Sequence, residues 1–431
     1  MKIQTRRNEL TWIIIGQVLA FVGGFFAIKI LTNVMGAEGY GQLALGVTIA
    51  GLCNLFVYGP LGQTVSRYYS VCRERGNLET YFYTLKKTHL VSVVALSICV
   101  LFVVIFAWLI GLENKWAQLI VAAVFFGIVS GISSSFQYLQ SAVRQRKIVA
   151  IHQAAEAWLR PGLGILALIW LSNSASVAFL GFFIGTLVIT LSQFFFAMRT
   201  TQIRSYWSGD ISSDDVRKKT QQEFSIYYRT LSGLAIFSVF SVYADRWILQ
   251  GMLDQNSVGI YVAIFQIASA PIVFLFNFTT RYVEPIIFER VGASGSDARV
   301  KSSDRFLYKV IAIFFVLLVP IIGISFLFGE PLVLMLTSAE FGYHSDMLWV
   351  FTLGLTMYYV AQLLTIKGAS LNRPNIYVLP KLLQAIMLLV AGIIFTPQFG
   401  VMGMAEAVLL TSGVYLALVI IANQKLPVQC I

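Results

Sequence analysis

The sequence has few charged residues and lacks the motifs that soluble enzymes use for catalysis. Charged side chains make up 12% of the 431 residues, and the chain contains 4 cysteines and 3 histidines. No P-loop, HExxH or paired CxxC motif occurs, which argues against nucleotide hydrolysis, metalloprotease chemistry and structural zinc sites. We therefore predict that the protein is not an enzyme, and we expect no catalytic residues, no metal site and no cofactor.

Long apolar runs dominate the chain instead. Hydrophobic residues make up 58% of it, and the mean hydropathy is +0.77. A soluble domain of this composition would expose a large apolar surface to water, so lipid is the expected solvent. A membrane-spanning helix requires about 20 mostly apolar residues. Twelve stretches reach this length, at about 11–32, 42–64, 89–111, 116–140, 150–171, 176–198, 224–253, 258–280, 307–328, 346–366, 376–395 and 401–423.

The positive charges are distributed unevenly among the connections between these stretches. Of the 31 Lys and Arg residues, 24 fall in every second connection or at the termini, and only Lys115 falls in the other connections. Because short Lys- and Arg-rich loops stay cytoplasmic, both termini are expected in the cytoplasm. Membrane orientation and anionic lipids explain the net charge of +11. No recognition motif surrounds these cations, so we expect no nucleic-acid partner.

The longest polar connection divides the chain into two halves. Residues 199–223 are predicted to form a cytoplasmic linker between an N-terminal six-helix lobe, 1–198, and a C-terminal six-helix lobe, 224–431. The segment MGAEGYGQLAL follows the first stretch and LDQNSVGIYVAI follows the seventh, so that Gly41 and Gly259 are offset by 218 residues. This pattern predicts a parallel repeat with a pseudo-two-fold axis along the membrane normal, and a central cavity between the lobes.

Charges inside the predicted helices are the main functional candidates, because each is costly in lipid and should face a partner or a cavity. Arg160 lies at the centre of the fifth stretch, and Glu156 precedes it by four residues. This spacing places both on one helical face and favours an ion pair. Two interpretations stay open: a structural ion pair, or an Arg160 that contacts an anionic substrate.

The seventh stretch contains adjacent charges, Asp245 and Arg246. Successive helical residues diverge by about 100°, so these two are expected to have different partners. Lys29 lies near the corresponding position of the first repeat, which predicts one cation on each wall of the cavity. Lys29 is also close enough to its helix end to extend its ammonium to the membrane surface.

Each of the remaining intramembrane charges has two possible roles. Lys381 and Arg229 lie near the inner ends of their helices, where they either reach the membrane surface or form the inner mouth of a cationic path. Glu406 in the last stretch and Asp245 are candidates to bind a coupling proton or sodium ion, or to form salt bridges.

Several short segments resemble one family. They are MGAEGYGQLAL with Gly36, Gly39, Tyr40 and Gly41, the Asp245–Arg246 pair followed by Val258, Gly259, Ile260 and Tyr261, and FGVMGMAEA. These segments resemble the Wzx-type polysaccharide flippases of the multidrug/oligosaccharidyl-lipid/polysaccharide (MOP) exporter superfamily, which are also similar in helix number, predicted orientation and central loop.

The resemblance implies a V-shaped pair of six-helix bundles around a central cationic cavity, working by alternating access in the bacterial cytoplasmic (inner) membrane. Its implied substrate is an undecaprenyl-pyrophosphate-linked oligosaccharide, such as an O-antigen repeat unit for lipopolysaccharide. Arg160, Arg246 and Lys29 would hold the pyrophosphate. Implied partners are membrane lipids and the polysaccharide polymerase machinery. Glu406 departs from the small residues that the family favours, and the two extra helices of the lipid II flippases are missing.

Two alternatives remain on the sequence alone. The first is a multidrug antiporter of the same superfamily that exchanges organic cations for sodium ions or protons, although a positively charged cavity argues against it. The second is a structural or regulatory membrane protein that shares the fold and transports nothing.

Overall fold

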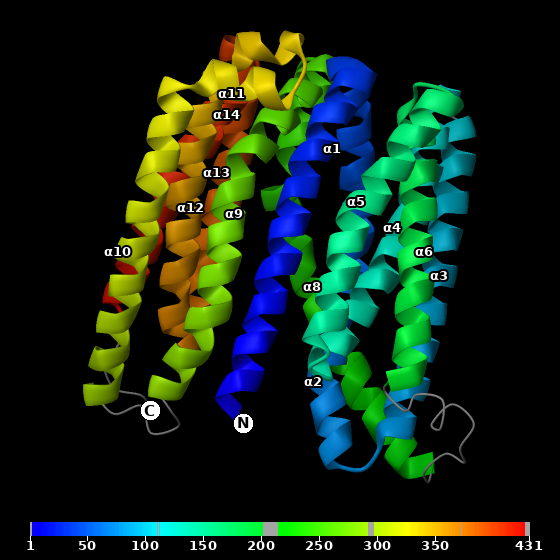
Figure 1. The fold of residues 1–431 in the computed structure, drawn as a ribbon, viewed down its shortest axis with the longest axis vertical. Helices are drawn as coiled ribbons and strands as arrows, with labels where there is room; N and C mark the ends of the chain where they lie inside the picture. The colour runs from blue at the N-terminus through cyan, green and yellow to red at the C-terminus, as the bar shows by residue number, and fades with distance from the viewer. Residues whose placement is uncertain are drawn as a thin grey trace. The chain divides into compact units, whose positions relative to one another are not determined.

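The structure is a computed structural model that describes residues 2–109, 111, 113–200, 214–291, 297–371 and 373–426. Over these ranges the regular elements are all helices (Figure 1). They are α1 (Lys2–Cys53), a π-helical turn η1 (Asn54–Tyr58), α2 (Gly59–Glu74), α3 (Leu78–Leu109), α4 (Asn114–Ala142), α5 (Arg146–Trp170), α6 (Ala175–Thr200), α8 (Asp214–Met252), α9 (Gln255–Val291), α10 (Asp297–Leu327), α11 (Gly329–Leu336), η2 (Ala339–His344), α12 (Met347–Ser370), η3 (Pro374–Tyr377), α13 (Val378–Phe399) and α14 (Val401–Gln424).

The predicted apolar stretches fall on these helices, which confirms the all-α fold class. Several helices are longer than predicted, since α3 begins at Leu78 rather than 89, α10 begins at Asp297 rather than 307, and α9 ends at Val291 rather than 280. Within the described residues, nine helical segments are long and apolar enough to cross a membrane. One of them, Ile14–Glu74, covers most of the first predicted stretch and all of the second. The helices α5 and α8 are not among the nine, and both carry charged residues along their apolar segments. The protein is therefore a multi-pass membrane protein.

The helix α1 changes direction at Gly36, where the backbone has φ 66° and ψ −179°. This left-handed φ disfavours any residue with a Cβ. Because the break interrupts the helical hydrogen bonds, the amide of Ala37 needs another acceptor. The carboxylate of Glu340, in η2, accepts a hydrogen bond from it at 2.7 Å. An acidic residue of a distant connection therefore caps the second segment of α1.

The described chain separates into two compact units. The N-terminal unit comprises Met1–Met35 and Gln42–Val239, and the C-terminal unit comprises Gly36–Gly41 and Phe240–Ile431. The division between Val239 and Phe240 falls inside α8. The assignment of 199–223 as a linker stays a prediction, and residues 201–213 of it lie outside the described residues.

In the N-terminal unit, α4 packs against α2, α3, α5 and α6, and α5 packs along α6 (Figure 1). Glycine permits two close approaches in this unit, one between α6 and α5 and one between α4 and α1. A Cβ at Gly185 would lie 2.9 Å from the Cα of Arg160, which brings α6 directly against the backbone of α5. A Cβ at Gly127 would lie 3.0 Å from the carbonyl oxygen of Ala50. Small residues at such crossings are typical of helices that pack in lipid.

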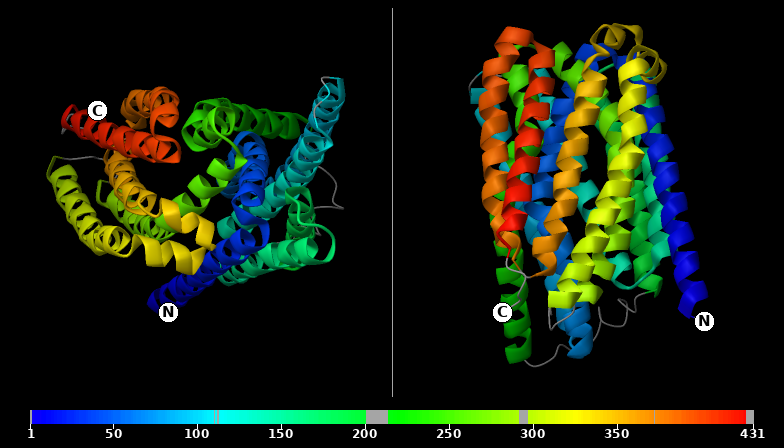
Figure 2. Two further views of the ribbon diagram at one scale, coloured as in Figure 1. Left: turned by 90° about the horizontal axis from the view of Figure 1, so that it is seen from above. Right: turned by 90° about the vertical axis from the view of Figure 1, so that its left-hand side faces the viewer.

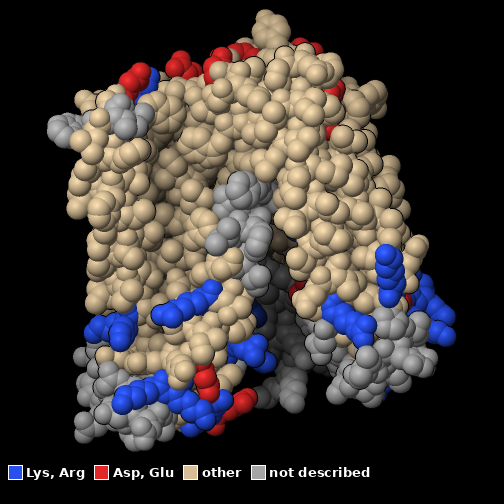
Figure 3. Space-filling model, turned by 180° about the vertical axis from the view of Figure 1, so that it is seen from behind, with Lys and Arg blue, Asp and Glu red and all other residues tan. Residues whose placement is uncertain are grey.

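In the C-terminal unit, α12 packs against α9, α10 and α14, and α13 packs against α14. The short helices α11 and η2 close one end of this unit, and the end of α14 lies at the other (Figure 2). In each unit, Lys and Arg gather toward one end of the helices, whereas Asp and Glu occur both there and at the opposite end (Figure 3). This distribution matches the loop pattern of the sequence. The cytoplasmic location of the termini stays a prediction.

Candidate functional site

Arg160 is half-buried on α5 and has no carboxylate partner in the described chain. Its guanidinium carbon lies 5.6 Å from the centre of the Phe126 ring on α4. Glu156, one turn earlier, does not pair with it. The Glu156 carboxylate accepts a hydrogen bond from Gln137 Nε2 at 3.1 Å and lies 3.5 Å from Ser133 Oγ, which shares its single hydrogen between Glu156 and Gln193. The hydrogen-bond partners of the Glu156 carboxylate therefore come from α4. The Arg160 guanidinium is available to bind another anion.

The hydrogen bonds of Glu156 belong to a wider polar network that joins α4, α5 and α6. Ser133 Oγ donates to Gln193 Oε1 at 3.1 Å. Gln153 Nε2 donates to Gln137 Oε1 at 3.0 Å. Sequence reasoning did not identify this network, because its members come from three helices. The only signal was the recurrence of polar residues every three or four positions on α4 and α5.

Asp245 and Arg246 have different surroundings, as their adjacency predicts. Asp245 is 8% exposed. Its carboxylate accepts hydrogen bonds from the Tyr261 hydroxyl at 2.7 Å and from the backbone amide of Arg246 at 2.9 Å. The guanidinium carbon of Arg246 lies 5.8 Å from the centre of the Tyr243 ring, and its buried Nε has no hydrogen-bond partner. Neither side chain forms an ion pair among the described residues.

Lys381 lies among aromatic rings in the C-terminal unit. Its Nζ donates to the Tyr358 hydroxyl at 2.6 Å. The ammonium is 4.3 Å from the centre of the Tyr358 ring and 5.2 Å from that of Tyr415. Gln362 Nε2 also donates to the Tyr358 hydroxyl, at 2.9 Å. The ring faces stabilise the cation without neutralising it, because they carry only partial negative charge.

The other predicted residues are dispersed. Lys29 is half-buried on α1, and its backbone carbonyl accepts a hydrogen bond from Asn33 Nδ2 at 2.6 Å. Glu406 is half-buried on α14, and its side chain has neither an ion pair nor a hydrogen bond within the described chain. Arg229 is exposed on α8, where it lines a cavity.

This cavity, which we call the α3–α8 cavity, lies within the N-terminal unit and has a volume of about 660 Å³. Three cations line it, and the rest of the lining is divided between hydroxyl or amide groups and apolar side chains. Its lining residues are Val57, Thr84, Lys87, Thr88, Val91, Ser92, Ala95, Leu96, Lys218, Gln221, Gln222, Phe224, Ser225, Tyr228 and Arg229. Sequence reasoning singled out Arg229 but not the cavity.

The candidate residues thus fall into two groups. Lys29, Glu156, Arg160 and Arg229 belong to the N-terminal unit, while Asp245, Arg246, Lys381 and Glu406 belong to the C-terminal unit. A single cavity shared by the two groups stays a prediction. No cluster of three or more potential metal ligands occurs in the described part of the chain.

Solved structures with the same fold are membrane transporters. The lipid II flippase MurJ, in an inward closed conformation, is similar with a TM-score of 0.64 and 14% identity, over 97% of this chain and 88% of MurJ. An inward-facing multidrug resistance MATE family transporter of the MOP superfamily has a TM-score of 0.61 and 13% identity, over 96% of this chain and 93% of that chain. Identities at this level show a shared fold alone.

A third similar structure is a MOP superfamily transporter from Pyrococcus furiosus, described as having a binding pocket of reverse polarity. Its TM-score is 0.55 and its identity 11%, over 96% of this chain and 91% of that chain. None of the curated proteins matches the sequence significantly. The profile of one family, described as "Polysaccharide biosynthesis protein", matches residues 7–291. Because this match covers more than half of the chain, the protein belongs to the polysaccharide biosynthesis protein family, with the helical fold of the MOP superfamily transporters.

Proposed function

We propose that the protein is a flippase that moves an undecaprenyl-pyrophosphate-linked oligosaccharide, such as an O-antigen repeat unit, across the bacterial cytoplasmic membrane. Membership of the polysaccharide biosynthesis family and the fold shared with the lipid II flippase MurJ support a lipid-linked substrate. The sugars and the pyrophosphate need a polar route, while the polyprenyl chain can stay in the lipid. Alternating access between the two membrane faces would supply that route without covalent chemistry.

The unpaired guanidinium of Arg160 is the observation that carries this proposal. A charged side chain within a spanning helix costs about 2.5 to 3.5 kcal/mol on insertion scales, so it is usually paired. Here the acid one turn away, Glu156, takes its hydrogen bonds from Gln137 and Ser133. A pyrophosphate would offer Arg160 charge-assisted, bidentate hydrogen bonds. Arg246, Lys29 and Lys381 are proposed as further contacts for the same group.

The energy source and the cellular partners belong to the same proposal. Asp245 is buried and Glu406 is half-buried, and neither has an ion-pair partner among the described residues, so they are the candidates to bind a coupling proton or sodium ion. The termini would be cytoplasmic, as the positive charge of alternate connections indicates. The product would be delivered to the polysaccharide polymerase machinery at the outer face.

A cation-coupled multidrug antiporter is the second candidate, because MATE transporters share the fold. The buried carboxylate of Asp245 is the observation that favours it, since an unpaired acid suits a cationic drug or a coupling ion. The unpaired guanidinium groups of Arg160 and Arg246 disfavour it, because they would repel an organic cation.

The test is the outward movement of a fluorescent polyprenyl-pyrophosphate oligosaccharide in reconstituted liposomes, with a cationic dye measured in parallel. We expect the wild-type protein to move the lipid-linked sugar, and we expect Arg160→Ala to move it at a rate at least tenfold lower. Arg305→Ala, which removes an exposed cation from α10, should retain the wild-type rate. Full activity of Arg160→Ala would eliminate the proposed contact. Movement of the dye alone would assign the protein to drug export.

A further inference from the structure

We propose that the α3–α8 cavity binds the phosphate headgroup of an anionic membrane lipid, whose hydrocarbon chains lie along the apolar surface of α3. The inference does not depend on the transport proposal, because lipid binding is measured without movement across the membrane. It rests on the shape of the cavity, the charge and the hydrogen-bond donors of its lining, and the exposed surface beside it.

Both walls of the cavity are single helical faces. On α3 the lining residues fall at 84, 87, 88, 91, 92, 95 and 96, and on α8 they include 218, 221, 222, 225, 228 and 229. Steps of three and four residues keep a row of side chains on one face of a helix. At 1.5 Å per residue the α3 face is about 18 Å long. The cavity is therefore elongated along the helices, as a lipid headgroup and the start of its chains require.

The charge of the lining is positive throughout. Lys87, Lys218 and Arg229 are exposed and form no ion pair in the described chain, and no Asp or Glu is among the lining residues. The nearby acid Glu223 is occupied, because Arg75 pairs with its carboxylate at 2.8 Å. These three cations, one from α3 and two from α8, would attract an anionic lipid headgroup.

The polar part of the lining supplies hydrogen-bond donors as well as charge. Thr88, Gln221, Gln222 and Ser225 line the cavity and carry hydroxyl or amide donors. Phosphate oxygens accept several hydrogen bonds at once, so this combination of donors and cations suits a phosphate better than a carboxylate.

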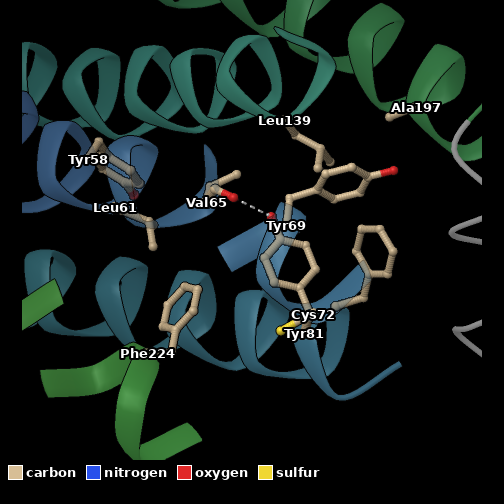
Figure 4. Close-up of a cluster of buried hydrophobic side chains, with 10 residues drawn as sticks. Tyr58, Leu61, Val65, Tyr69, Cys72, Tyr81, Leu139, Ala197 and Phe224 are labelled. Carbon is tan, nitrogen blue, oxygen red and sulfur yellow. Dashed lines mark hydrogen bonds between the residues drawn. The ribbon is translucent and has the colours of Figure 1, made fainter. Parts of the chain in front are cut away.

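One wall of the cavity is firmly packed. Phe224 lines the cavity and belongs to a buried cluster with Tyr58, Leu61 and Tyr81 (Figure 4). The hydroxyl of Tyr81 donates to the carbonyl oxygen of Val65 at 3.0 Å, which ties α3 to α2. Buried aromatic side chains of this kind hold the wall in one arrangement. This wall of the cavity therefore keeps its shape whether or not a ligand is bound.

The surface next to the cavity suits hydrocarbon. Leu90 and Val94 lie between lining positions on α3 and are 62% and 48% exposed, and Ile226 on α8 is 58% exposed. Farther along α3, Leu101 and Phe102 are 59% and 68% exposed. Exposed apolar side chains on a membrane helix contact lipid chains. The chains of a lipid whose headgroup lies in the cavity would contact such side chains, whereas a soluble phosphate has no chains to place there.

The test measures lipid binding to the detergent-purified full-length protein by native mass spectrometry. The probes are phosphatidylglycerol, undecaprenyl phosphate, zwitterionic phosphatidylcholine and inorganic phosphate. We expect both anionic lipids to bind at least tenfold more tightly than phosphatidylcholine. The triple variant K87Q/K218Q/R229Q should lose this preference. The relative affinity of the two anionic lipids identifies whether the source of the phosphate is a bulk phospholipid or a polyprenyl lipid.

The matched control is K301Q/R305Q/K309Q, which removes the same charge from exposed positions on α10 outside the cavity. It should bind as wild type does. A second variant, Ala95→Trp, fills the cavity without changing its charge and should also weaken binding at least tenfold. Circular dichroism melting establishes whether each variant is folded. If the triple variant is not folded, the single variants R229Q and A95W replace it in the binding measurement.

Three outcomes would overturn the proposal. They are wild-type lipid binding by folded R229Q and A95W, equal loss of binding in the α10 control, and equal affinity for phosphatidylcholine and phosphatidylglycerol. Displacement of both anionic lipids by an equimolar amount of inorganic phosphate would also overturn it, because the site would then recognise the ion and not the lipid.

Discussion

Gly41 on α1 and Gly259 on α9 lie against each other in a reciprocal contact within the C-terminal unit. A Cβ at Gly41 would approach the carbonyl of Gln255 and come within 2.9 Å of the Gly259 amide nitrogen. A Cβ at Gly259 would approach the carbonyl of Ala37 and come within 2.9 Å of the Gly41 amide nitrogen. Gly41 and Gly259 are 218 positions apart, and so are Ala37 and Gln255. Each glycine therefore contacts the other glycine and the residue one helical turn before it. This is the geometry expected of repeat-related residues on a two-fold axis.

Alanine at either glycine should destabilise the protein. We expect Gly41→Ala and Gly259→Ala each to lower the stability by about 1 to 3 kcal/mol, because the added Cβ meets backbone atoms that cannot rotate away. The reciprocal contact predicts similar losses for the two variants, measured as melting temperatures in detergent. Gly251→Ala is the control, since no atom lies within 4 Å of its added Cβ. It should be neutral or slightly stabilising, and unequal losses at Gly41 and Gly259 would contradict the symmetry.

Removal of the Glu340 carboxylate should loosen the second segment of α1. Glu340→Ala leaves the Ala37 amide without its acceptor, and loss of a capping side chain costs about 1 kcal/mol. Faster hydrogen exchange at the Ala37 amide and a lower melting temperature are the expected results. Glu340→Gln keeps an oxygen acceptor and should stay closer to wild type. Unchanged exchange in Glu340→Ala would show that the cap has no energetic role.

The hydrogen bond between Tyr261 and Asp245 should be important for stability. Tyr261→Phe removes a donor from a buried carboxylate, at a cost of about 1 to 3 kcal/mol. Asp245→Asn keeps an acceptor and removes the charge, so it should cost less. Tyr343→Phe provides a matched control, because Tyr343 is 91% exposed. The melting temperatures of the three variants are the measurement. If the Tyr261 hydroxyl did not contribute to stability, Tyr261→Phe and Tyr343→Phe would have the same melting temperature.

Lys381 should matter more for transport than for folding. Lys381→Met loses a cation–π interaction of about 0.5 to 2 kcal/mol, but it also removes a charge from a membrane helix. The two effects offset each other, so we expect a small change in melting temperature. If Lys381 contacts the pyrophosphate, the rate of lipid-linked sugar movement should fall at least tenfold. Lys309→Met, at an exposed position on α10, should retain the rate. A large loss of stability would instead identify Lys381 as structural.

The helices were predictable because long apolar runs have few alternatives to a helix in lipid. The contacts of individual side chains could not be predicted in the same way. The i, i+4 spacing of Glu156 and Arg160 favours an ion pair, but Gln137 and Ser133 approach from another helix and take the acid instead. Spacing along a helix determines which residues share a face, whereas helix crossings determine what that face meets. The α3–α8 cavity is formed by two helices far apart in sequence and escaped prediction for this reason.

The hydrogen bond from Ala37 to Glu340 also has a consequence for the length of the connection between α11 and α12. Loops usually tolerate insertions because little depends on where their residues lie. Here the η2 turn must hold one carboxylate within 2.7 Å of a helix amide, so an inserted tag on the α11 side of Glu340 would displace it. The exposed ring of Tyr343 marks a site beyond the cap where an insertion would do less harm. The part of this connection between α11 and Glu340 therefore has a fixed length, unlike an ordinary loop.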